Sequence, residues 1–152
     1  MANDHDSIRK WISTIHRYSM TYRSRSFSQH GIGSGQLSFL SVLYQKDGIS
    51  QDELAQQLHI DKTTAARAIQ KLEQLGLVSR KTSTVDRRVN LVFLTQKARD
   101  IHPDILSTMQ AWTDILVQGF SAAERELLLD MLKKVSRNAV DYISKLEKGG
   151  KL

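Results

Sequence analysis

The 152-residue chain contains no cysteine, one proline and only eight glycines. The absence of cysteine excludes disulfides, thiolate metal sites, thiol nucleophiles and cysteine-based redox sensing. Because proline and glycine mark turns, their scarcity predicts a mainly helical chain. No apolar run approaches the roughly 20 residues that span a bilayer, and residues 1–6 are polar and acidic, unlike a signal peptide. We therefore expect a soluble cytoplasmic protein with no membrane partner.

The charge balance favours a polyanionic partner. The formal net charge is +6 and the sequence pI is about 9.7. The excess is local, since the segment from Lys62 to Thr95 holds seven basic residues against Glu73 and Asp86, a net charge of +5. A solvated basic surface with no partner would have the same composition, so charge alone leaves the function open.

Apolar spacing predicts long helices at both ends of the chain. After residue 7, apolar side chains recur at three- and four-residue steps, which is the pattern of one helix face. Glycines at 31, 33 and 35 then predict a loop. A second stripe runs from Ile101 to Leu116, and a capping box at Ser121–Glu124 opens a last apolar helix. These faces exceed what a small domain can cover, which predicts packing against a second copy.

The middle of the chain predicts a helix-turn-helix followed by a hairpin. Residues 50–53 (SQDE) form a second predicted capping box, and Asp61 is a predicted N-cap for a helix that ends at Leu75. Gly76 suits the left-handed position after that helix. Residues 77–81 and 89–94 are rich in β-branched and apolar side chains around a polar stretch, which is typical of a hairpin.

The predicted helix from Lys62 to Leu75 has one apolar face and one polar face. The polar face has Thr63, Arg67, Gln70 and Gln74 at its centre, and contains no acidic residue. Its hydroxyl, guanidinium and amide groups are those that read base edges and phosphates in a major groove. The alternative is a face that only keeps the helix soluble.

The predicted hairpin loop carries Asp86, Arg87 and Arg88, with Arg80 and Lys81 on the adjacent strand. A two-stranded ribbon that ends in arginines can enter a minor groove, where narrow A·T-rich tracts concentrate negative potential. We expect Asp86 to fix an arginine by a charge-assisted fork of hydrogen bonds. A merely solvated loop is the alternative.

Residues 61–67 (DKTTAAR), 72–78 (LEQLGLV) and 86–88 (DRR), with Leu94-Thr95, resemble the MarR (multiple antibiotic resistance regulator) family over nearly the whole chain. The resemblance implies a mainly α fold with a small β-hairpin wing. A winged helix-turn-helix DNA-binding domain would span 34–95, between an N-terminal dimerisation helix and loop at 1–33 and C-terminal dimerisation helices at 96–152. The implied function is a sequence-specific regulator of transcription, a repressor that binds double-stranded DNA as a homodimer on a pseudo-palindromic operator.

The resemblance also assigns roles to residues. Thr63, Thr64 and Arg67 take recognition-helix roles, Arg88 takes the wing role, and Asp86 supports it. Ala66 departs from the threonine of many relatives, and Arg87 adds a basic residue to the wing. The predicted DNA-binding set is Thr63, Thr64, Arg67, Gln70, Lys71, Arg87 and Arg88, with Ser34, Lys62 and Arg80 as weaker phosphate candidates.

The family resemblance further suggests a small aromatic or phenolic effector, bound between the dimerisation helices and the DNA-binding domain. Its candidate residues are Trp11, His16, Tyr18, Tyr22 and Trp112, although aromatic side chains on such stripes more often belong to a core. The five histidines show no ligand spacing, so we expect no metal and no cofactor.

Two other classes of protein compete with this interpretation. An enzyme is disfavoured because the chain has no nucleophile elbow, no glycine-rich phosphate loop and no HExxH, and the neighbours His102 and Asp104 are a commonplace pair. The remaining alternative is a winged-helix module that packages DNA or binds protein without sequence preference. The polar face at Thr63, Arg67 and Gln70 favours base reading instead.

Overall fold

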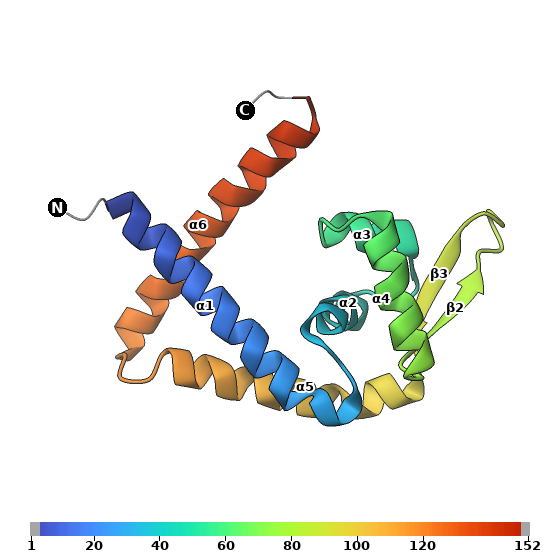
Figure 1. Ribbon diagram of the computed structural model, residues 1–152, viewed down its shortest axis with the longest axis horizontal. Coiled ribbons are helices and arrows are strands. Elements are labelled where there is room, and N and C mark those ends of the chain that lie inside the picture. The colour runs from blue at the N-terminus through green and yellow to red at the C-terminus, as the bar shows by residue number, and fades with distance from the viewer. Residues whose placement is uncertain (1–3, 150–152) are drawn as a thin grey trace. The chain divides into compact units, whose positions relative to one another are not determined.

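The computed structural model describes residues 4–149, and the chain divides into two compact units, Met1–Trp112 and Thr113–Leu152. Figure 1 shows the elements, which confirm a mainly helical chain with a small antiparallel sheet. In chain order they are α1 (Asp4–Ser26), the 3-10 helix η1 (Ser28–His30), α2 (Ser34–Gln45), β1 (Ile49–Ser50), α3 (Gln51–Gln57), α4 (Lys62–Gln74), β2 (Val78–Thr82), β3 (Asn90–Leu94), α5 (Gln96–Leu116) and α6 (Ala122–Glu147).

The sheet has the strand order β1-β3-β2, and both pairings are antiparallel. The predicted hairpin is confirmed as β2 and β3, paired from Val78↔Leu94 to Thr82↔Asn90. Strand β1 was not predicted, because its two residues are too few to show an alternating pattern; Ile49 pairs with Val92. The hairpin lies beside α4 (Figure 1).

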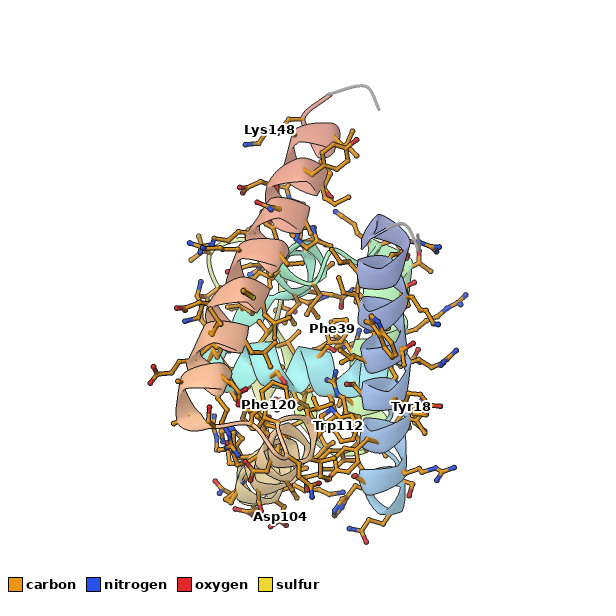
Figure 2. All side chains as sticks on the ribbon, turned by 90° about the vertical axis from the view of Figure 1, so that its left-hand side faces the viewer. Tyr18, Phe39, Asp104, Trp112, Phe120 and Lys148 are labelled. Atoms are coloured by element: carbon orange, nitrogen blue, oxygen red, sulfur yellow. The ribbon has the colours of Figure 1, made fainter. Side chains whose placement is uncertain are left out.

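The core of the first unit fixes α4 against its neighbours. Phe39 and Leu40 of α2, Leu54 of α3, Ile69 of α4 and Val92 of β3 are almost completely buried together. Figure 2 shows Phe39 in the interior among the other side chains. Burial of each such side chain contributes about 1.5–3 kcal/mol to the stability of the fold. This packing holds α4 in place, with the side opposite Ile69 facing away from the core.

Two predicted helix starts differ from the structure. Gly35 lies inside α2 rather than in a loop, because the side chain of Gln36 accepts a hydrogen bond from the backbone N–H of Gly33 at 3.0 Å and starts the helix at Ser34. At α3, Ser50 accepts from the N–H of Glu53 at 3.0 Å, as predicted. The Glu53 carboxylate does not complete the capping box, since Lys46 and Gln57 bind it instead.

The second unit contains the end of α5 and helix α6. The capping box predicted at Ser121 and Glu124 is confirmed, with both reciprocal hydrogen bonds present. Leu116, expected on the core stripe of α5, is exposed, and α6 exposes a series of large apolar side chains: Leu127, Leu129, Met131, Leu132, Val135, Val140, Tyr142 and Ile143. No helix among residues 4–149 is both long and apolar enough to cross a membrane.

Candidate nucleic-acid interface

Helix α4 begins at a cap that also engages the first predicted contact residues. The carboxylate of Asp61 accepts from the backbone N–H of Thr64 at 2.9 Å and from its hydroxyl at 2.6 Å. These bonds, the hydroxyl bond first, hold the pKa of Asp61 below its ordinary value. The hydroxyl of Thr64 therefore donates its proton to Asp61, and its oxygen can still accept a hydrogen bond. The hydroxyl of the neighbouring Thr63 can still donate one.

The two faces of α4 are as the sequence predicts. Ala65, Ala68, Ile69 and Leu72 are buried. The predicted contact residues on the other side are exposed to solvent, namely Thr63, Thr64, Arg67, Gln70 and Lys71. Among the described side chains no carboxylate pairs with Arg67 or Lys71. This face therefore offers unpaired positive charge and uncommitted polar groups.

The wing loop carries the arginine fork that the sequence predicts. Arg88 donates from Nε to Oδ1 of Asp86 and from Nη2 to Oδ2, both at 3.1 Å, and its backbone N–H reaches Oδ1 at 2.9 Å. The hydrogen bond from the Arg88 side chain is the main cause that lowers the pKa of Asp86. The Arg88 side chain stays 90% exposed. Its guanidinium is thus oriented without being covered.

Two of the three weaker phosphate candidates are occupied by ion pairs. Arg80 donates through Nη2 to Glu73 of α4 at 2.7 Å, and this bond lowers the pKa of Glu73. Lys62 Nζ lies 2.8 Å from Asp52 of α3. Ser34, the third candidate, is the half-buried first residue of α2. Arg87 has no acidic partner within the described part of the chain.

The structure brings two of the five predicted effector residues together. The rings of Tyr22 and Trp112 stack with centroids 4.7 Å apart, and Trp112 donates from Nε1 to Ser19 at 2.9 Å. Trp11, His16 and Tyr18 are exposed on α1 instead, and Figure 2 shows Tyr18 on the outside of that helix. Residues 4–149 contain no group of three or more His, Asp or Glu side chains that could hold a metal ion.

Comparison with known proteins explains this arrangement. Residues 32–89 match the model of the MarR family. A MarR transcriptional regulator from Methanosarcina mazei Go1 has 39% sequence identity and a TM-score of 0.86, over 90% of this chain and 99% of that one. The chain belongs to the MarR family. It is therefore a helix-turn-helix regulator of transcription that binds DNA.

Two further relatives cover most of this MarR-family chain. The regulator YybA of Bacillus subtilis is 28% identical over 146 residues, which are 96% of this chain and 97% of YybA. A MarR family regulator of Listeria monocytogenes, solved in complex with a 26mer DNA, has 32% identity and a TM-score of 0.83 over 94% of this chain and 95% of its own.

Proposed function

We propose that this MarR-family protein is a homodimeric repressor that reads a pseudo-palindromic operator. The observation that carries the proposal is the acid-free polar face of α4 on the same rigid unit as the exposed arginine fork of the wing. A helix of this kind fits a major groove and the wing fits the adjacent minor groove. Thr63, Arg67 and Gln70 would read bases, Thr64 would accept a hydrogen bond, and Lys71 and Arg87 would contact phosphates.

Exposed apolar side chains support the proposed homodimer. Helix α1 exposes Trp11 and Tyr18 by 58% and 56%, together with Ile8, Ile12 and Ile15, and α6 exposes a longer series. Large apolar side chains exposed in series along a helix are typical of a protein–protein interface. In a two-fold dimer, both copies would present α4 to the same duplex about 34–36 Å apart, and the +6 charge of each chain would make binding fall steeply with salt.

Release by an effector is the third part of the proposal. The stacked pair Tyr22 and Trp112 offers an aromatic surface that links α1 to α5. A small aromatic or phenolic compound could stack there, and Trp11, His16 and Tyr18 would take part only if the second copy covers them. Because Tyr22 also donates to the carbonyl oxygen of Thr108 at 3.3 Å, a competing ligand would disturb a bond between the two helices.

Base reading by α4 is tested by replacing Arg67 with alanine and comparing the operator with random duplex at one salt concentration. A base contact predicts a loss of about 1–3 kcal/mol on the operator and a much smaller loss on random DNA. Equal losses on both duplexes would favour the alternative, a winged-helix module that packages DNA without sequence preference. Binding to neither duplex at low salt would favour a protein-interaction module.

A further inference from the structure

A polar cleft of about 290 Å³ lies between the start of α3 and the end of the wing loop. One side is formed by Ser50, Gln51 and Asp52, and the other by Arg88, Val89 and Asn90. Ser50, Gln51 and Asn90 carry neutral groups that can donate hydrogen bonds. Of these six residues only Arg88 belongs to the DNA-binding set that the sequence predicts, so the other donors have no function assigned to them.

The charges at this cleft are compensated by neighbours. Asp52 pairs with Lys62 at 2.8 Å, and Arg88 pairs with Asp86 at 3.1 Å. The cleft therefore has no net positive charge to hold a small free anion against water. The pairing with Lys62 also offsets the repulsion that a bare Asp52 would exert on a phosphate. A phosphate that another contact brings to the cleft would meet neutral donors and the exposed guanidinium of Arg88.

The position of the cleft indicates what brings that phosphate. At one end Asp52 is joined to Lys62, the first residue of α4, and at the other end Arg88 belongs to the wing. The cleft thus lies between the element proposed to enter a major groove and the element proposed to enter a minor groove. In a duplex, neighbouring major and minor grooves are separated by one sugar–phosphate strand.

We propose that this cleft binds the phosphodiester strand between the two grooves, with the side chains of Ser50, Gln51 and Asn90 as hydrogen-bond donors. The inference rests on the proposed function, because it takes the placement of α4 and the wing from it. Such contacts carry no sequence information but fix the register of the protein on the duplex. Gln51 and Asn90 are thus contacts to the DNA backbone.

The test uses charge changes that keep the shape of each side chain. Asn90→Asp and Gln51→Glu place a negative charge against the strand, and Gln45→Glu makes the same change at an exposed residue of α2 outside the cleft. We expect both cleft variants to bind operator and random duplex about tenfold more weakly, by the same factor on each. Gln45→Glu should stay within about twofold of wild type. Equal melting temperatures check that all variants fold.

Phosphate ethylation interference locates the contact. For wild type, we expect ethylation of one phosphate between the two grooves of each half-site to block binding, and this interference should disappear for Asn90→Ala with Gln51→Ala. The inference is overturned if the cleft variants bind like Gln45→Glu, if they weaken binding to the operator alone, or if inorganic phosphate competes better than chloride at equal ionic strength. Failure of wild type to bind any duplex would instead overturn the proposed function itself.

Discussion

The guanidinium of Arg99 donates to the carboxylate of Asp47 at 2.6 Å, and this ion pair joins α5 to the turn after α2. The other oxygen of Asp47 accepts from the backbone N–H of Leu94 at 2.8 Å and of Gly48 at 3.0 Å. Leu94 is the last residue of β3. The side chain of Asp47 therefore links β3 to α5.

Replacement of the two partners should have unequal effects on stability. Arg99→Ala removes a half-exposed ion pair, and we expect the free energy of unfolding to fall by about 1 kcal/mol or less. Asp47→Ala also leaves the backbone N–H of Leu94 without its acceptor, whereas the N–H of Gly48 keeps its bond to the carbonyl oxygen of Val92 at 3.0 Å. We therefore expect a loss of about 2 kcal/mol. Urea denaturation at one protein concentration measures both. If the two losses are equal, Asp47 contributes only its charge.

The environment of Tyr44 predicts that the folded protein loses stability at alkaline pH. Its hydroxyl donates to the carbonyl oxygen of Ala98 at 2.6 Å, its ring stacks on His102, and burial raises the pKa of Tyr44 to about 12. The ordinary pKa in the unfolded chain is about 10. The stabilising contribution is thus complete below pH 10 and is lost as the pH rises from about 10 to about 12.

The control for this pH dependence is Tyr44→Phe, which cannot ionise at that position. We expect this variant to lose about 1 kcal/mol of unfolding free energy at pH 8 and to show a weaker decline of melting temperature between pH 10 and 11.5 than wild type. Parallel melting-temperature curves for the two proteins would mean that Tyr44 does not contribute to the alkaline transition.

Replacing Arg88 and replacing Asp86, which share the fork of hydrogen bonds in the wing loop, should affect operator affinity to different extents. Arg88→Ala removes the charge that would enter the minor groove, and we expect operator affinity to fall by at least about tenfold with the dimer unchanged. Asp86→Asn keeps that charge but loses its orientation, so we expect a smaller loss. Gel-shift titration and analytical ultracentrifugation measure the two properties. Unchanged affinity of Arg88→Ala would contradict the role of the wing.

Glu73 restrains a cation that could otherwise contact DNA. Glu73→Gln removes the partner of Arg80 and one negative charge, so we expect nonspecific affinity to rise several-fold at low salt, with a salt dependence steeper by about one counterion. The matched change Glu53→Gln on α3, which frees Lys46 at the end of α2, serves as the control. If both variants behave alike, the effect comes from total charge rather than from Arg80.

Features within about five residues of one another, and the hairpin with its polar loop, could be predicted from the sequence. Side-chain pairings between different elements could not. The two faces of α4 follow from its apolar spacing, and the Asp86–Arg88 fork follows from a separation of two residues. The ion pairs of Arg80 with Glu73 and of Lys62 with Asp52 depend on how one element packs on the next. For the same reason the sequence did not indicate Gln51 and Asn90, which lie on opposite sides of one cleft.

The sequence predicts more apolar surface on the terminal helices than a small domain can cover, but it does not show which side chains stay exposed in one chain. Periodicity shows that Leu116 and Ile15 lie on apolar faces, but not whether those faces are covered within one chain. Both side chains are exposed, by 42% and 48%. The predicted apolar faces are present, and we propose that a second copy of the chain covers them.

Hydroxyl-radical footprinting on the duplex upstream of the gene, at low salt, tests most directly whether α4 and the wing contact one DNA together. We expect two symmetry-related protected regions about 34–36 Å apart, each with a flanking minor groove that Arg88→Ala exposes again while the centre stays protected. No protection of this duplex by the folded wild-type protein, or a footprint that Arg88→Ala leaves unchanged, would contradict it.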